Sequence, residues 1–153
     1  MPRGAGSRET RPVAHQAAER EESVSELCRQ AVERLAARLP GAQVSCHLRV
    51  GNRLRVIASL GGLRLIYEVP REQGGICWRA VDTREAQLVE DVRCDPDYMA
   101  TDERVRAEIA APVVGGDDTV LVLDAEFVDR EFRPEEAEAV VAEAARLESE
   151  MAK

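Results

Sequence analysis

The chain has 153 residues, of which 44% are hydrophobic and 33% are charged, and it carries a formal net charge of -8. A chain of this length can bury its own core as one domain without disulfides. The acidic balance argues against nucleic-acid binding, which depends on clustered Lys and Arg. No apolar run approaches the roughly 20 residues that span a bilayer, and the N-terminal residues lack the apolar core that a secretory signal requires, so we expect a cytoplasmic protein.

The N-terminal third is predicted to open with a tail and a helix. Residues 1–22 lack apolar periodicity, which indicates a flexible tail or an extension of the first helix. From Ser23 to Leu39 the apolar residues recur at helical spacing, and Ser23 with Glu26 forms a capping-box pattern. We therefore predict a helix from Ser23 and place the folded domain at 23–153.

Alternating apolar residues then predict three strands in succession. These run from Val44 to Val50, from Leu54 to Ala58 and from Leu63 to Val69. Gly51-Asn52 and Gly61-Gly62 supply residues that tolerate the tight turns between antiparallel strands. The first half of the domain is thus predicted to be a helix followed by a meander.

Residues 71–107 form the least regular part of the sequence. A short helix is predicted from Trp78 to Val81 and one strand near Ala86 to Val89. A long irregular stretch inside a small domain is often a binding loop. We expect this region to supply the walls of a pocket.

The last third predicts a hairpin and a closing helix. Short apolar runs from Ile109 to Val114 and from Val120 to Leu123 are joined by the turn-forming residues 115–118. Pro134 is tolerated in the first turn of the helix that follows. The whole order predicts an α+β fold with a central antiparallel sheet flanked by helices.

Several short stretches resemble those of the GAF domain, a PAS-like fold with a ligand cavity under its loops. They are Gly-Ile-Cys-Trp-Arg-Ala at 75–80, Ala-Gln-Leu-Val-Glu-Asp-Val at 86–92, Asp95-Pro96 with Tyr98, Arg-Ala-Glu-Ile-Ala-Ala-Pro-Val at 106–113, Leu-Val-Leu-Asp-Ala-Glu at 121–126, and Phe132. The resemblance spans most of residues 24–150. It implies a pocket beneath the irregular middle region.

Among GAF proteins the sequence is most similar to the free methionine-(R)-sulfoxide reductase type, which uses three cysteines. Cys77 matches one of them, whereas Tyr67 and Thr101 occupy the other two positions. Sulfoxide reduction needs an attacking thiolate and a second thiol that resolves the sulfenic acid, so the chemistry of that enzyme is not expected here.

The same resemblance implies a ligand-binding wall. Glu108, Asp124 and Glu126 match the acids that such enzymes direct toward the amino group of their substrate. The alternative is that these acids face solvent at strand edges. Thr101, Trp78 and Tyr98 are further candidates for the pocket, although core packing explains the two aromatic residues equally well.

Four cysteines stand far apart without a C-x-x-C pair: Cys28, Cys46, Cys77 and Cys94. With only His15 and His47 as further donors, this spacing predicts no zinc site. Cys77 is a candidate redox thiol, because backbone amides at a helix start lower a thiol pKa, and the alternative is a buried structural cysteine. Cys94 is a second redox candidate, and its neighbour Asp95 disfavours the thiolate.

Three functions remain open from the sequence. The first is a bacterial sensory or regulatory GAF module that binds a small molecule, without catalysis, and signals through its terminal helices. The second is a thiol-dependent enzyme related to the sulfoxide reductases, and the third is a protein-interaction module with a vestigial pocket. The apolar stripes of the terminal helices predict a homodimer or a regulatory protein partner. No cofactor is identified, and His47, which shares a strand face with Ser45 and Arg49, is expected to be solvated.

Overall fold

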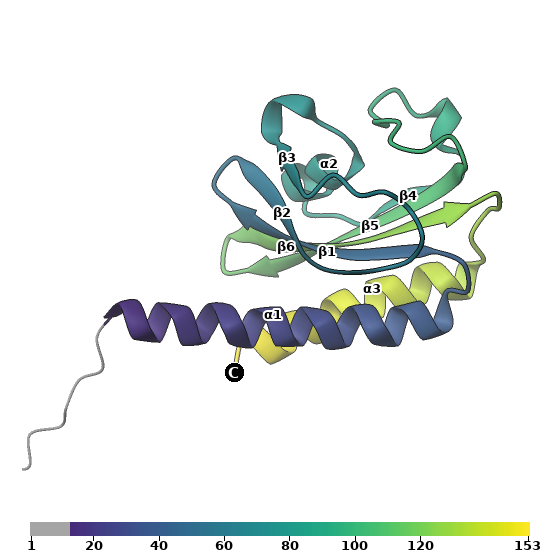
Figure 1. Ribbon diagram of the computed structural model, residues 1–153. Helices are drawn as coiled ribbons and strands as arrows, with labels where there is room; N and C mark the ends of the chain where they lie inside the picture. Colours follow the sequence, from purple (N-terminus) through teal and green to yellow (C-terminus); the bar gives the residue numbers. More distant parts are fainter. Residues whose placement is uncertain (1–12) are drawn as a thin grey trace, which may run out of the picture.

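The computed structural model describes residues 13–153, which form one six-stranded antiparallel sheet and three α-helices (Figure 1). The strand order across the sheet is β3-β2-β1-β6-β5-β4. The strands are β1 Gln43–Val50, β2 Arg53–Leu60, β3 Glu68–Pro70, β4 Gln87–Val89, β5 Val105–Gly115 and β6 Asp118–Val128. This arrangement confirms the predicted α+β fold with a central antiparallel sheet.

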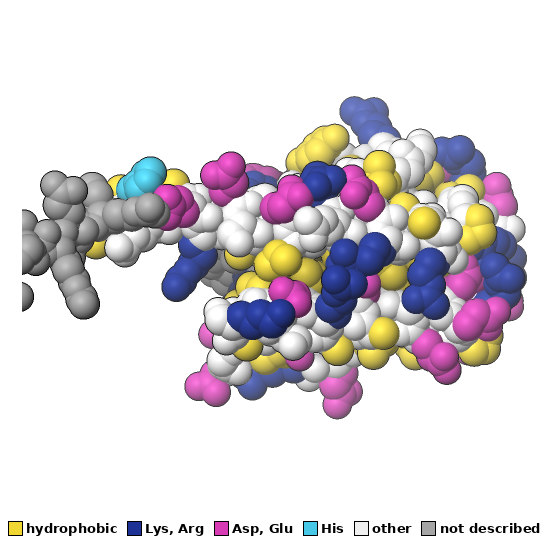
Figure 2. Space-filling view, turned by 90° about the horizontal axis from the view of Figure 1, so that it is seen from below, with side chains coloured by type: hydrophobic (Ala, Val, Ile, Leu, Met, Phe, Trp, Pro, Cys, Tyr) yellow, Lys and Arg dark blue, Asp and Glu magenta, His cyan; other side chains and the backbone are white. Residues whose placement is uncertain are grey.

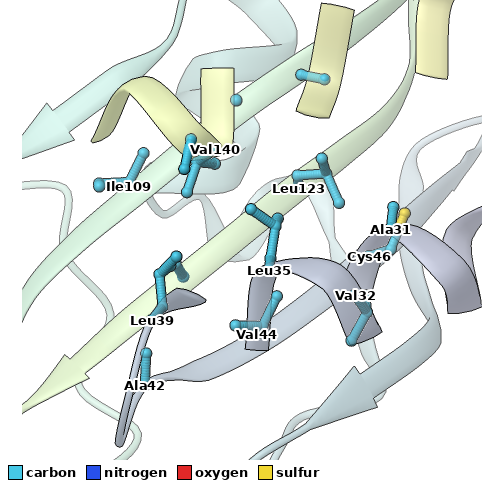
Figure 3. Packing of buried hydrophobic residues seen from close by; sticks show 14 of the residues in the cluster. Ala31, Val32, Leu35, Leu39, Ala42, Val44, Cys46, Ile109, Leu123 and Val140 are labelled. Carbon is cyan, nitrogen blue, oxygen red and sulfur yellow. The ribbon is translucent and has the colours of Figure 1, made fainter. Parts of the chain in front are cut away.

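One face of the sheet is covered by the two long helices, α1 (Val13–Arg38) and α3 (Pro134–Met151), which pack against each other beneath it (Figure 1). Figure 3 shows side chains from both helices meeting those of the strands. Leu35 of α1 and Val140 of α3 lie over Leu123 of β6, and all three are at most 2% exposed. We call this the helix face.

The alternation of side chains along β6 explains why the sheet has two different faces. Its helix-face residues are all apolar and fully buried: Leu121, Leu123, Ala125 and Phe127. The intervening residues point to the opposite face, because successive strand side chains alternate. There Val122 is apolar, but Asp124 and Glu126 are acidic.

The opposite face is covered by α2 (Ile76–Thr83), two short 3-10 turns and long loops, and we call it the loop face (Figure 1). The turns are Arg71–Gln73 and Val92–Cys94. A smaller apolar cluster fixes α2 to this face, with Trp78 at its centre. The Trp78 Nε1–H donates a hydrogen bond to the Val69 carbonyl oxygen over 3.0 Å.

The first helix begins before the capping pattern at Ser23, so residues 13–22 form the helix extension that was one of the two alternatives for this segment. α1 starts at Val13, so Ser23 lies inside the helix and does not cap it. The residues between them are mostly Ala, Glu and Gln, which favour helix and allow it to continue toward the N-terminus. This part of α1 extends past the edge of the sheet (Figure 1). Residues 1–12 of the predicted tail lie outside the described residues.

The predicted strand from Leu63 to Val69 is wrong for most of its length, because β3 contains only Glu68–Pro70. The Gln43 side chain explains the departure: its Oε1 accepts a hydrogen bond from the Leu63 backbone N–H over 2.9 Å. Gly61 permits this approach, since its φ is 142° and a Cβ there would lie 2.4 Å from Gln43 Oε1. The chain therefore crosses the loop face, where a regular edge strand was expected.

Other predicted elements are confirmed with adjusted ends. The predicted hairpin of Ile109 to Val114 and Val120 to Leu123 is the longer pair β5 and β6, and α3 begins at Pro134 as expected.

Viewed from the helix side, basic and acidic side chains are interspersed without a large patch of one sign (Figure 2). Within residues 13–153, no helix is both long and apolar enough to cross a bilayer.

Candidate functional site

The loop face holds a small cavity of about 70 Å³ whose floor is made by polar side chains of the three central strands. Strand register brings these side chains together. Asp124 of β6 lies opposite Ser45 of β1 on one side and Ala110 of β5 on the other, and Glu126 lies opposite Glu108. Acidic side chains from two strands therefore occupy adjacent positions on one sheet face.

The three acids are withdrawn from solvent without cationic partners. Glu108 and Asp124 are 6% and 3% exposed, and Glu126 is half-buried. Among residues 13–153, none forms an ion pair with these carboxylates, although Arg64 also borders the cavity. Like charges directly across a strand pair repel each other, so this cluster favours either protons or a bound cation.

The pKa values express the same conflict. Burial, reinforced by the Asp124 carboxylate, raises the pKa of Glu108 well above its usual value. Burial also raises the pKa of Asp124 to about 7, against the lowering effect of its hydrogen bond with Glu108, and raises the pKa of Glu126 to about 8. Asp124 and Glu126 therefore titrate near neutral pH, and perturbed carboxyl groups of this kind are typical of functional sites.

Cys77 borders the cavity at the start of α2, and its sulfur lies within 4.8 Å of an Asp124 carboxylate oxygen. The expected lowering of its pKa by the helix start is wrong. Burial first, and then the charges of Asp124, Glu108 and Glu126, raise the pKa of the Cys77 thiol well above its usual value. Cys77 is therefore a protonated thiol under ordinary conditions and a weak nucleophile.

His47 is the main site residue that sequence reasoning missed. It was expected to be solvated, but it is only 7% exposed and lines the cavity with Ser45. The Ser45 Oγ lies 3.2 Å from His47 Nε2, and His47 Nδ1 is buried without a hydrogen-bond partner among the described residues. Burial lowers the pKa of His47 to about 4, so the ring is neutral. No local signal indicated this burial, because it depends on α2 and the 61–67 loop, which cover the loop face.

The remaining candidates divide between the cavity and its surroundings. Thr101 is exposed at the cavity rim, next to Met99. Trp78 does not line the cavity, because its ring is buried in the apolar cluster of α2, with the Arg71 guanidinium stacked 4.3 Å from its centre. Tyr98 is half-buried, and burial together with Glu126 and Glu108 raises its pKa.

The four cysteines are free and dispersed. Cys28 and Cys46 are fully buried in the helix-face core, which agrees with their predicted structural role. Cys94 is exposed and borders a different surface depression, beside Asp95 and Pro96. Among the described residues, Cys77 is the only cysteine that lines the cavity.

A charged clamp holds the loop that follows β4. Arg79 of α2 donates hydrogen bonds to both carboxylate oxygens of Asp95, at 2.8 and 2.7 Å, and to Asp97 at 2.9 Å. It also donates to Gln87 of β4. Tyr98 immediately follows this anchored turn, so the clamp fixes one side of the loop that reaches Met99 and Thr101.

A comparison with known protein families gives a match over most of the chain. The model of the family described as GAF domain matches residues 21–147. The chain belongs to the GAF domain family. This shows the predicted resemblance to be correct and agrees with the pocket-forming loops on one face of the sheet.

Individual relatives include reductases of free methionine sulfoxide. A stretch of 58 residues is 36% identical to free methionine-R-sulfoxide reductase of Saccharomyces cerevisiae, covering 37% of this chain but only 32% of that enzyme. The type II enzyme from Thermoplasma acidophilum superposes with a TM-score of 0.76 at 20% identity, over 86% of this chain and 94% of that one. The Neisseria meningitidis enzyme in complex with its substrate gives 0.72 at 20% identity, over 94% and 93%. At this identity the structural likeness shows the fold.

Proposed function

We propose that this GAF domain is a sensory or regulatory module whose loop-face cavity binds a small ligand through a cationic group. The observation that carries the proposal is the cluster of Glu108, Asp124 and Glu126, which are withdrawn from water and lack ion-pair partners among residues 13–153. A cation bound there offsets the mutual repulsion and the cost of desolvating the carboxylates. A reactive residue is not required.

The same strands offer a path from ligand to output. Asp124 and Glu126 alternate along β6 with residues that pack against α1 and α3. In this proposal, ligand binding shifts these helices, and the signal passes to a second copy of the chain or to a regulatory protein in the cytoplasm. Light scattering at micromolar concentration tests the homodimer, which predicts twice the chain mass, and a monomer at every accessible concentration contradicts it.

A ligand screen tests the pocket directly. We expect a primary amine or an amino acid to raise the melting temperature by about 5–10 °C at a hundredfold excess over its dissociation constant. Glu126→Gln removes one cavity charge and weakens the shift, whereas Glu90→Gln changes an exposed acid away from the cavity and leaves it intact. A shift that survives Glu126→Gln and Asp124→Asn places the ligand elsewhere and contradicts the proposal.

The enzyme alternative is favoured by the similarity to the sulfoxide reductases and by the presence of Cys77 in the cavity. It lacks a second thiol there, because Thr101 occupies the rim and Cys94 borders another surface. A hydroxyl does not replace a thiolate in the redox cycle. A thioredoxin-coupled assay with free methionine-R-sulfoxide decides the matter. Turnover that is abolished by Cys77→Ser overturns the non-catalytic proposal.

A further inference from the structure

Three side chains with metal-ligating atoms converge above the centre of the sheet. They are His47 of β1, Cys77 at the start of α2 and Asp124 of β6, and their candidate ligand atoms all lie within 4.8 Å of one another. A tetrahedral zinc ion with bonds of about 2.0–2.3 Å separates its ligand atoms by roughly 3.5 Å. Small side-chain adjustments therefore suffice to surround one ion.

Two of these side chains present buried polar atoms that have no hydrogen-bond partner in residues 13–153. They are His47 Nδ1 and Asp124 Oδ1, on residues that are 7% and 3% exposed. Unpartnered buried polar atoms are rare, because each forfeits its interaction with water. Their presence in one cluster, together with a thiol, indicates an occupant that accepts electron pairs from nitrogen, sulfur and oxygen.

The Ser45 hydroxyl also orients the His47 imidazole, through the ring nitrogen that is not proposed as a metal ligand. His47 Nε2 lies 3.2 Å from the Ser45 Oγ, which is itself 1% exposed. When Nε2 carries the proton and donates it to Ser45, Nδ1 keeps its lone pair for a ligand. A hydrogen bond on the second ring nitrogen is the usual support of a metal-binding histidine.

We propose that the cavity binds one thiophilic divalent metal ion of the zinc class through His47 Nδ1, Cys77 Sγ and an Asp124 carboxylate oxygen. A mixed set of imidazole, thiolate and carboxylate matches zinc, whereas magnesium and calcium prefer oxygen ligands alone. A fourth position is left for a water molecule or a ligand atom from the cavity.

This inference rests on the proposed function, because it names the class of cation that the acidic floor takes. It also revises the expectation of no zinc site. That expectation used spacing along the chain, and the three donors stand far apart in sequence. Antiparallel pairing of β1 with β6, and the packing of α2 above them, bring the donors together.

Cobalt titration of the chelator-treated full chain provides the test. We expect one Co²⁺ per chain, with a thiolate-to-cobalt charge-transfer band in the near ultraviolet and the visible bands of tetrahedral cobalt, and Zn²⁺ should displace it. Cys77→Ser should abolish the charge-transfer band, whereas Cys94→Ser, which alters the exposed thiol, should leave it unchanged. His47→Gln retains the thiol and should remove the tetrahedral spectrum.

Ser45→Ala tests the positioning of the imidazole. It keeps all three ligands and should weaken Co²⁺ binding by about 10–100-fold. Circular dichroism and melting temperatures confirm that each variant is folded. A band that persists in Cys77→Ser, or that Cys94→Ser abolishes, assigns the metal to a different thiol and overturns the inference, as does the absence of any cobalt spectrum.

The same chelator-treated protein is used for the amine screen, so the two proposals fail separately. An amine that stabilises the protein in the absence of a cobalt spectrum leaves the proposed function standing and removes the metal site. A cobalt spectrum that depends on Cys77, without any organic ligand, supports the metal site. The absence of both contradicts both proposals.

Discussion

The two faces of the central sheet bury different kinds of side chain. On the helix face the strands bury only apolar side chains, such as Ile109 and Leu123, against α1 and α3. On the loop face the same strands bury Glu108 and Asp124, and polar atoms remain without partners. Burial of apolar surface stabilises the fold, whereas unpaired buried charge destabilises it. The larger part of the apolar core therefore lies on the helix face, whereas the loop face combines a smaller apolar cluster with polar groups that a ligand can satisfy.

Two buried acids make the contrast concrete. Glu136, at the start of α3, is 2% exposed and accepts hydrogen bonds of 2.7 Å from both Arg130 terminal nitrogens. The pairing lowers the pKa of Glu136 to about 2, whereas burial raises that of the unpaired Asp124 to about 7. Similar burial thus shifts the two carboxyl pKa values in opposite directions, depending on whether a cationic partner is present.

Truncation of the helix-face core should have the largest effect. Phe127 is fully buried and packs with Phe132 at a ring distance of 5.7 Å. Phe127→Ala is expected to lower the free energy of unfolding by about 3–5 kcal/mol, measured by urea denaturation. Val141→Ala, at a 42% exposed position of α3, should change it by less than about 0.5 kcal/mol. Equal effects of the two substitutions would mean that the helix face is not the core.

The acids of the loop face should make the protein less stable as pH rises. Asp124 and Glu126 hold their protons more tightly in the folded state, so their contribution is present below pH 4 and is lost as pH rises through about 7 and 8. We expect a loss of about 2–4 kcal/mol between pH 5 and pH 9. Asp124→Asn should flatten this slope, and equal slopes in both proteins would contradict the unpaired state of Asp124.

Glu136 should show the opposite dependence. Its pKa is lowered on folding, so its contribution is present above about pH 4.5 and is lost as pH falls toward 2. Glu136→Gln is expected to cost about 1–3 kcal/mol at pH 7 and progressively less in acid, measured as urea midpoints at pH 7 and pH 3. A gap that widens in acid would be inconsistent with the pairing to Arg130.

The smallest effect is expected for the Tyr98 hydroxyl. It is buried without a hydrogen-bond partner among the described residues, so its removal leaves no other polar group without a partner. Tyr98→Phe should change the free energy of unfolding by no more than about 0.5 kcal/mol, or stabilise the protein. Any ligand that the hydroxyl contacts should bind more weakly to the variant, as isothermal titration would show. A loss above 1 kcal/mol would reveal a partner for the hydroxyl.

The sequence predicted the helix face more completely than the loop face. Apolar periodicity is a local signal, and it correctly indicated β1, β5, β6 and α3, although the strands run further than their apolar centres. It failed at Leu63, because the backbone N–H there donates a hydrogen bond to the Gln43 side chain of β1, a residue distant in sequence. It also left the start of α1 open between a tail and a helix extension before Ser23, and the helix continues back to Val13, past the capping pattern.

The sequence predicted the cavity residues that lie in family-like stretches, and it missed the residue whose place in the cavity depends on distant segments of the fold. Cys77, Thr101 and the three acids were identified through the family resemblance, and all border the cavity. Trp78 was misplaced, because Cys77 and Trp78 are consecutive residues of α2 and their side chains point about 100° apart around the helix, into different surroundings. His47 was missed because its burial depends on α2 and the 61–67 loop, neither of which strand alternation describes.

Neighbouring residues of β6 point to opposite faces of the sheet, so a movement on one face is coupled to the other. Leu123, Asp124 and Ala125 are consecutive, and they point alternately toward the helices and toward the cavity. A ligand that pulls the Asp124 backbone by a few tenths of an ångström must move its neighbours with it, because the bonded backbone is nearly inextensible. The close-packed contacts beneath transmit such displacements instead of absorbing them. In the proposed sensory function, ligand occupancy is therefore expected as a tilt of α1 and α3 without any hinge, lid or change of fold.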